Sequence, residues 1–184
     1  MNNKNNNNLF NFVYSALFAA LIIVLGFISI PIGPVPISGI SLGVMLAGAV
    51  LSVRQAVYSI LIVILLGAAG LPVFSGFTGG IGILLGPRGG YYLGFLLGVG
   101  IISLLRGNNN NTFRLFAAIF TGSILIEYII AIPWLLFITQ MHLKQAIWLG
   151  MLPFLPGDIL KTILATILAK ALYKNIPALR RYNE

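Results

Sequence analysis

Apolar runs separated by short polar breaks fill most of the 184-residue chain. A helix needs about 20 apolar residues to cross the hydrocarbon core of a bilayer, with a usual range of about 17–25. The runs predict helices over residues 9–30, 39–52, 56–71, 91–105, 113–139 and 148–173, with a kink at Pro133 in the fifth. The second and third are short and meet at a tight turn around Arg54. This pattern predicts an all-α integral membrane protein, a compact bundle of six transmembrane helices.

Three of the breaks are rich in glycine and proline, at residues 31–38, 72–90 and 153–157. The last of them divides the sixth predicted helix. In a six-helix bundle, all three breaks fall on the same side of the membrane. Non-helical backbone at membrane depth is tolerated only where protein buries it or water reaches it. The breaks therefore predict a pocket that opens to that side.

The composition agrees with a membrane protein and excludes several kinds of site. Charged residues make up 8% of the chain and mean hydropathy is +1.01, whereas soluble domains carry about 25% charged residues. With no cysteine and one histidine, His142, neither a disulfide nor a transition-metal centre is expected. The chain has no Gly-x-x-x-x-Gly-Lys-Ser/Thr motif for binding ATP. We expect a protein that is not an enzyme and that has no cofactor.

The basic residues are scattered singly between apolar runs, so the net charge of +8 indicates membrane topology rather than nucleic-acid binding. With six spans, the side of the breaks holds Arg88, Lys144 and Lys161. The side with both termini holds Lys4, Arg54, Arg106, Arg114, Lys170, Lys174, Arg180 and Arg181. The positive-inside rule then predicts cytoplasmic termini and a pocket that faces outward. The Asn-rich residues 1–8 are expected to be a disordered cytoplasmic tail, and residues 9–184 a single substrate-binding domain.

Asp158 is one of only three acidic residues, and it lies three positions before Lys161. This spacing puts both charges on one face of a helix, where each costs about 2.5–3.5 kcal/mol at lipid depth. The carboxylate could accept hydrogen bonds from two N–H groups of a urea-like or amide ligand, or could simply cap the helix that follows Gly157. Lys161 could neutralise Asp158, reach a ligand carboxylate, or extend its ammonium to the membrane interface. The pair therefore calls for a functional explanation.

The glycine-rich break around Arg88 supplies further candidates for the pocket. The Arg88 guanidinium could form a bidentate pair with a carboxylate, or contact a lipid headgroup. Gly79 and Gly80 would allow close approach of backbone to a ligand, although glycine also serves ordinary loop packing. Aromatic residues in the outer segments, including Phe74, Tyr91 and Phe154, predict an interfacial belt, part of which could line an apolar pocket.

Two other features lie within the predicted helices. Glu127 is in the middle of the fifth and could relay protons. A structural interhelical hydrogen bond is the favoured interpretation, because no second acid or histidine within the membrane is expected to pair with it. On the first helix, Ala16 and Ala20 lie one turn apart, and small residues at this spacing let another helix pack closely.

Four stretches together resemble the BioY family, the biotin-specific S components of energy-coupling-factor transporters. They are Gly33-Pro34-Val35-Pro36-Ile37, Gly70-Leu71-Pro72-Val73-Phe74, Gly86-Pro87 with Gly89-Gly90-Tyr91, and Pro153-Phe154-Leu155-Pro156-Gly157-Asp158 with Lys161. The chain departs from the family pattern in three places. Ser38-Gly39-Ile40 stands where the family usually has Thr-Leu-Gln, Phe77-Thr78 stands where it often has Gly-Gly, and Arg88 stands in place of a threonine.

The resemblance implies six helices, a biotin site near the outer face and a partner module with a transmembrane coupling subunit and two ATPase subunits. It places Pro36 and Ser38 at the site, gives the ureido N–H groups of biotin to Asp158, and gives the ligand carboxylate to either Arg88 or Lys161. Ala16 and Ala20 fit the element by which such S components dock on the coupling subunit. A bacterial plasma-membrane location follows. The alternatives are an S component for another small vitamin, or a non-transporting membrane scaffold with an internal Asp158–Lys161 pair.

Overall fold

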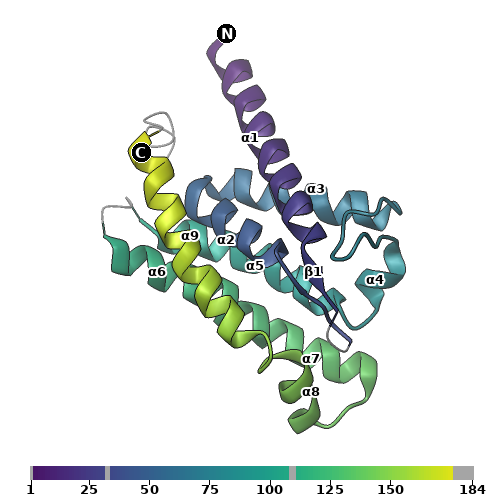
Figure 1. The fold of residues 1–184 in the computed structure, drawn as a ribbon. Coiled ribbons are helices and arrows are strands. Elements are labelled where there is room, and N and C mark those ends of the chain that lie inside the picture. The colour runs from purple at the N-terminus through teal and green to yellow at the C-terminus, as the bar shows by residue number, and fades with distance from the viewer. Residues whose placement is uncertain (1, 32–33, 108–110, 176–184) are drawn as a thin grey trace.

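The predicted apolar runs form helices in the computed structural model of the protein, which describes residues 2–31, 34–107 and 111–175 (Figure 1). In chain order the α-helices are α1 (Asn2–Phe27), α2 (Ile40–Val50), α3 (Val53–Ala68), α4 (Ile81–Leu85), α5 (Gly89–Leu105), α6 (Thr112–Phe120), α7 (Glu127–Thr139), α8 (Leu143–Gly150) and α9 (Leu155–Asn175). A π-helix, η1 (Thr121–Ile126), joins α6 to α7. Gly33, Arg180 and Arg181, which the sequence analysis used, lie outside the described residues.

Helix boundaries differ from the predicted ones where hydrogen bonding decides them rather than apolarity. α1 begins at Asn2, ahead of the predicted start at residue 9, since extending an existing helix is easier than starting one. Residues after Phe27 leave the helix and form the antiparallel hairpin of β1 (Ser29–Ile30) and β2 (Ile37–Ser38). The fold is therefore mostly, but not entirely, helical. The last helical pair starts at Leu143 rather than at residue 148.

The fifth predicted helix is a continuous segment of 28 residues, Thr112–Thr139, but its irregular part is not at the proline. The departure from α-helical geometry is η1, and Pro133 lies within α7. A π-helical turn holds more residues than an α-helical turn, so it changes which face the following side chains occupy. Glu127 and Tyr128, the first two residues of α7, follow η1 directly.

Local chemistry explains the turn between α2 and α3. Ser52 is the N-cap of α3, and its backbone N–H donates to Oε1 of Gln55 at 3.1 Å while its side chain accepts from the backbone N–H of Gln55. This reciprocal capping box satisfies two of the amide groups that a helix start leaves free. It therefore allows the chain to reverse within two residues, as the short predicted helices required.

Helix α5 lies at the centre of the bundle and packs against α2, α3, α7 and η1. Its glycines bring neighbouring backbones close, because a Cβ at Gly98 would lie only 2.3 Å from the carbonyl oxygen of Gly122. A Cβ at Gly94 would likewise lie 2.9 Å from Cα of Glu127. Helices in a membrane associate through such small-residue contacts. These glycines therefore set how close Glu127 comes to α5.

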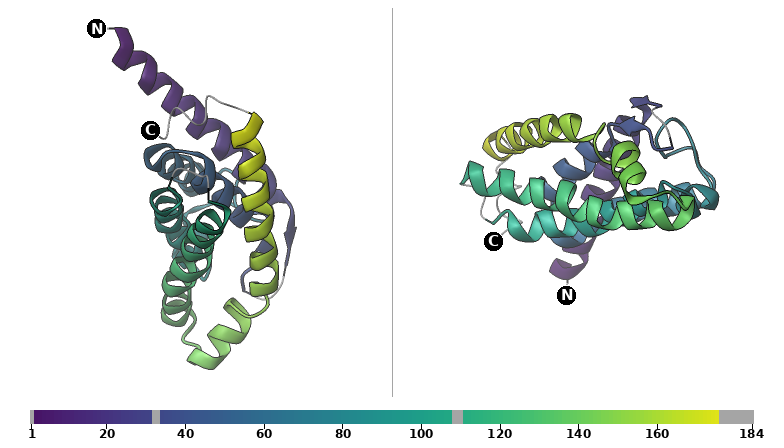
Figure 2. Two further views of the ribbon diagram at one scale, coloured as in Figure 1. Left: turned by 90° about the vertical axis from the view of Figure 1, so that its left-hand side faces the viewer. Right: turned by 90° about the horizontal axis from the view of Figure 1, so that it is seen from below.

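Helix length alone identifies few spans. Within the described residues, Thr112–Thr139 is the one helical segment long and apolar enough to cross a membrane unaided, and α8 with α9 would add another despite a 46° bend between them. The segment Asn11–Phe27, α2, α3 and α5 are apolar but shorter. The start of α1 and the end of α9 lie at one end of the bundle, while the hairpin and α8 lie toward the other (Figure 1). α9 runs along one side of the bundle against α2 and α6 (Figure 2).

We expect Gly67→Ala to destabilise the protein, because a Cβ at this position would lie 2.0 Å from the ring of Phe74, which is completely buried. Overpacking of this kind costs about 1–3 kcal/mol. Thermal unfolding in detergent measures it as a lowered Tm. The matched control is Gly82→Ala, since Gly82 is exposed on α4 and a Cβ there meets nothing within 4 Å. Equal Tm values for the two variants would contradict this packing account.

Candidate ligand-binding site

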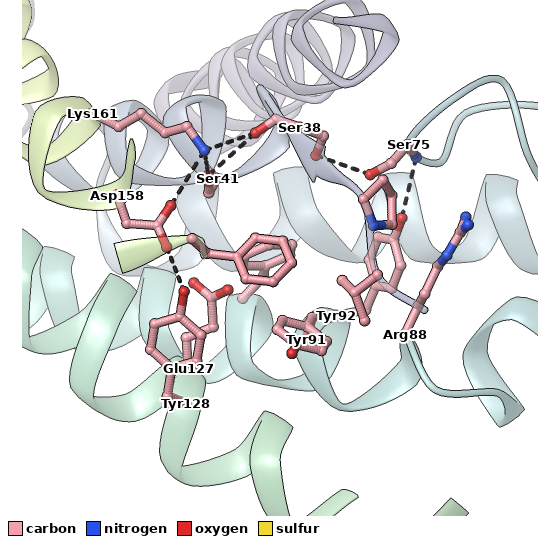
Figure 3. Close-up of a pocket in the computed structure, with 14 residues that line it drawn as sticks. Ser38, Ser41, Ser75, Arg88, Tyr91, Tyr92, Glu127, Tyr128, Asp158 and Lys161 are labelled. Carbon is pink, nitrogen blue, oxygen red and sulfur yellow. Dashed lines mark hydrogen bonds and ion pairs between the residues drawn. The ribbon is translucent and has the colours of Figure 1, made fainter. Parts of the chain in front are cut away.

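All three glycine- and proline-rich breaks contribute to one pocket, as the sequence predicted (Figure 3). The pocket is surrounded by the hairpin, the loop before α5, the chain between α8 and α9, and the first turns of α5, α7 and α9. Its volume is about 40 Å³. The lining residues are Val35, Pro36, Ser38, Ser41, Ser75, Arg88, Tyr91, Tyr92, Phe95, Glu127, Tyr128, Phe154, Asp158 and Lys161.

Asp158 is buried in the first turn of α9, with 4% of its surface exposed. Its Oδ2 accepts a hydrogen bond of 2.6 Å from the hydroxyl of Tyr128, and its Oδ1 lies 3.2 Å from Nζ of Lys161. Its own backbone N–H donates to the carbonyl of Phe154 inside the bundle. Asp158 is therefore not the residue that caps the helix, because α9 already begins at Leu155. The carboxylate faces the pocket instead.

Lys161 connects α9 to the hairpin and to α2. Its ammonium donates to the backbone carbonyl of Ser38 and to Oγ of Ser41, both at 2.9 Å, in addition to pairing with Asp158. An ammonium has three N–H donors, so these partners use all of them. Lys161 thus neutralises Asp158 and does not extend to the membrane interface, the other role that the sequence allowed.

Arg88 lies on the opposite side of the pocket from Asp158 and Lys161 (Figure 3). Its Nη1 donates to Oγ1 of Thr78 at 3.3 Å. Within the part of the chain that the structure describes, Arg88 forms no ion pair with a carboxylate. A guanidinium carries five N–H donors, so several remain available to an anion. The pocket therefore has a carboxylate–ammonium pair at one side and an arginine at the other.

Serine and tyrosine hydroxyls hold the two loops that border Arg88. Oγ of Ser75 donates to Oγ of Ser38 at 3.0 Å, which joins the loop before α4 to the hairpin. The backbone N–H of Ser75 donates to the hydroxyl of Tyr92 at 3.4 Å, and Oγ1 of Thr78 donates to the carbonyl of Ser75 at 3.0 Å. These bonds position the loops over the pocket.

Aromatic rings form the apolar part of the lining. Tyr91 packs against Phe154 with ring centroids 6.4 Å apart, and edge-on against Tyr128 at 6.5 Å. Its hydroxyl donates to the carbonyl of Gly150 at 2.6 Å, which ties α5 to the end of α8. Tyr91 and Phe154 were expected at the site, whereas Phe95 and Tyr128 were not. Such rings offer stacking surfaces for an apolar ligand.

Glu127 lines the pocket, with 4% of its surface exposed. The expected structural hydrogen bond to another helix is not found, because within the described residues its buried Oε2 has no hydrogen-bond partner. The absence of a second acid was the reason for that expectation. In the structure, however, Asp158 lines the same pocket as Glu127, which directly follows the π-helix η1.

Three expected site residues lie outside the pocket lining. Phe74 is in the core, with its ring 4.4 Å from that of Tyr92. Gly79 packs against the chain, since a Cβ there would lie 2.2 Å from the carbonyl oxygen of Leu71. Gly80 has a φ of +101°, a left-handed conformation that favours glycine, just before α4. Both glycines therefore serve the path of the loop, the alternative that the sequence left open.

Tyr92 belongs to the outer aromatic residues that the sequence offered for the lining, whereas five other lining residues were not predicted: Val35, Ser41, Ser75, Phe95 and Tyr128. Serines and aromatic residues are common in apolar helices, so none of them carries a signal without the fold. Ala16 and Ala20 are exposed on α1, away from the pocket lining. The described residues contain no group of three or more His, Cys, Asp or Glu side chains that could hold a metal ion.

Comparisons with known proteins agree over nearly the whole chain. The model of the BioY family matches residues 1–178. Biotin transporter BioY2 of Lactococcus lactis subsp. cremoris is 39% identical over 178 residues, which cover 96% of this chain and 97% of the relative. Biotin transporter BioY of Rhizobium etli is 37% identical and covers 91% of this chain and 95% of its own. The crystal structure of the S component for biotin from an ECF-type ABC transporter matches with a TM-score of 0.85 and 32% identity, over 95% of both chains.

Proposed function

This chain belongs to the BioY family, and we propose that it is the biotin-binding membrane subunit, or S component, of an ATP-driven vitamin importer. It captures biotin at the outer face and delivers it to the cytoplasm without covalent chemistry. The observation that carries the proposal is the distribution of charge in the pocket, with Asp158 at one side, Arg88 at the other and aromatic rings in the lining. Biotin has the matching order of a polar ureido ring, an apolar thiophane ring and chain, and a carboxylate.

The ureido ring of biotin binds at the Asp158 side. An N–H donor that meets an ionised carboxylate forms a charge-assisted hydrogen bond, which is stronger than a neutral one. The thiophane ring and the valeryl chain pack against Tyr91 and Phe154. Pro36 and Ser38 border the ligand from the hairpin side. Phe74, Gly79 and Gly80 act indirectly, by holding the loop that carries Thr78 next to Arg88.

The carboxylate of biotin binds to Arg88 rather than to Lys161. The three donors of the Lys161 ammonium already have partners, whereas Arg88 uses one hydrogen bond to Thr78. A free guanidinium can hold a carboxylate through two parallel hydrogen bonds. The arginine that departs from the usual family pattern at this position therefore takes the acid group of the ligand.

Binding requires the outer loops to move. The pocket volume of about 40 Å³ is far below the roughly 300–1,000 Å³ of typical small-molecule sites. The hairpin covers the pocket through the Lys161–Ser38 and Ser75–Ser38 hydrogen bonds. These bonds break when the hairpin opens, and closure over biotin makes them again.

The chain crosses the bacterial plasma membrane six times, with both termini in the cytoplasm. The excess of basic residues at the side of the termini supports this orientation, as does the position of the start of α1 and the end of α9 at one end of the bundle (Figure 1). The pocket then lies at the outer face. The 28-residue segment Thr112–Thr139 crosses alone, and shorter helices cross within the bundle, where protein shields their ends.

The chain has no ATP-binding loop of its own, so energy comes from a module with a transmembrane coupling subunit and two ATPase subunits. Ala16 and Ala20 on the exposed face of α1 form the docking surface for the coupling subunit. Two small residues one turn apart let helices approach closely.

The role of Asp158 is tested by Asp158→Asn, which we expect to weaken biotin binding at least tenfold, since it removes the charge from the acceptor. Isothermal titration calorimetry on purified protein measures the affinity. An analogue without ureido N–H groups should lose far less affinity on the same substitution. Thr166→Val is a matched control, because the buried Thr166 hydroxyl donates to the carbonyl of Thr162 in its own helix. Equal losses for both ligands would remove the assigned role, and no saturable binding of biotin by folded wild-type protein would overturn the proposed function.

The carboxylate assignment is tested by comparing biotin with its neutral primary amide. Arg88→Gln should weaken biotin about tenfold or more, because a hydrogen bond to a charged group contributes roughly 1.5–3 kcal/mol. The same variant should change the affinity for the amide little. Lys161→Met should weaken both ligands alike, since it leaves Asp158 unpaired. The reverse pattern in calorimetry would give the carboxylate to Lys161.

Docking is tested by Ala16→Trp, which should prevent co-purification with the coupling subunit while biotin affinity stays unchanged. The large ring would keep the partner helix from close approach. Ile167→Trp adds the same ring to an exposed position on α9 and should leave assembly intact. Co-purification of the Ala16→Trp variant in wild-type amounts would argue against a docking surface here.

A further inference from the structure

Glu127 is a buried carboxylate that faces the ligand pocket and has no role in the ligand contacts described above. Only 4% of its surface is exposed, and within the described residues its Oε2 accepts no hydrogen bond. It lies on the same side of the pocket as Asp158 and next to the phenol of Tyr128 (Figure 3). A buried polar atom that is left unsatisfied destabilises a protein, so each one needs an explanation.

The backbone holds Glu127 at the pocket. Gly94 of α5 lies against it, since a Cβ at Gly94 would be 2.9 Å from Cα and 3.2 Å from Cγ of Glu127. The π-helix η1 ends at the residue before it, and π-helical segments occur frequently at functional sites. Close packing on one side and the irregular turn before it thus direct the carboxylate toward the pocket.

The two acidic side chains of the pocket differ in what they already bind. Asp158 has a donor on each oxygen, from Tyr128 and from Lys161. Oε2 of Glu127 has none among the described residues. An incoming N–H therefore gains most at Glu127, where it satisfies an acceptor that is otherwise buried alone.

The geometry of a cyclic urea also calls for two separate acceptors. Its two N–H bonds flank the carbonyl and point away from each other, unlike the parallel pair of a guanidinium. One carboxylate can therefore accept from only one of them. The sequence-based expectation that Asp158 holds both N–H groups does not satisfy this geometry, and a second acceptor on the same side of the pocket does.

We propose that Glu127 is a specificity-determining residue of the ligand site, whose Oε2 accepts one ureido N–H of biotin while Asp158 accepts the other. This inference rests on the proposed function. Together the two carboxylates select cyclic ureas with both N–H groups intact. A ring that lacks one N–H leaves one of the two acceptors buried without a donor.

The test uses biotin and two cyclic carbamate analogues, in each of which an oxygen replaces one of the two ring N–H groups. Wild-type protein should bind both analogues at least tenfold more weakly than biotin in calorimetry. Glu127→Leu should weaken biotin at least tenfold and should bind one of the analogues about as well as biotin. It should still discriminate against the other analogue, whose missing N–H belongs to Asp158.

Two further variants keep the result interpretable. Glu127→Gln retains an acceptor oxygen without the charge, so its affinity for biotin should lie between those of wild type and Glu127→Leu. Ser123→Ala removes a buried hydroxyl of η1 that donates to the carbonyl of Ile119 in α6, and should leave all three affinities unchanged. The Tm of Glu127→Leu should not fall, because a buried unpaired carboxylate is removed.

Unchanged biotin affinity in both Glu127 variants, or an equal loss for all three ligands, would overturn the role of Glu127. If Asp158→Asn still weakened biotin in that case, the proposed function would stand without this inference. Wild-type protein that binds no biotin would overturn both.

Discussion

The buried ion pair between Asp158 and Lys161 is the interaction on which the arrangement of the pocket depends. Removing two charges from water costs several kcal/mol per ion, and a pair alone rarely recovers this. Here the hydroxyl of Tyr128 satisfies the carboxylate, and Ser38 and Ser41 satisfy the ammonium. These partners come from α7, the hairpin and α2, so the pair holds four parts of the chain together around one space.

A second polar cluster stabilises the other end of the bundle. The guanidinium of Arg106 bonds to the carbonyl of Ala49 and to the hydroxyl of Tyr173. That hydroxyl also donates to the carbonyls of Ala49 at 2.8 Å and Val50 at 3.0 Å. The last carbonyls of a helix have no hydrogen-bond donor within that helix. Here Arg106 at the end of α5 and Tyr173 of α9 donate to the last carbonyls of α2. Because two side chains tie three helices together at this end, opening at the hairpin end need not disturb it.

Helix α5 contributes both to the close packing of the bundle and to the lining of the pocket. Its glycines bring η1 and α7 near, while Tyr91 and Tyr92 at its start line the pocket. The same helix therefore fixes the distance to Glu127 and provides the aromatic lining. Phe74 supports this arrangement from the core, since it lies under Gly67 and against Tyr92 and holds the loop in front of Arg88. A change in core packing at this point would reach the ligand site through the loop.

The sequence by itself determined the features that depend on local pattern. The apolar runs predicted the main helices, the glycine and proline clusters predicted the breaks, and the spacing of Asp158 and Lys161 predicted that they share a face. Only the tertiary structure decided the features that depend on contacts between distant segments. The partners of Lys161 lie about 120 residues earlier in the chain, Phe74 enters the core, and Glu127 reaches the pocket because η1 alters the helix before it. Hydrogen bonds and close packing across such separations leave no period in the sequence, so the pocket's position was predictable and most of its polar partners were not.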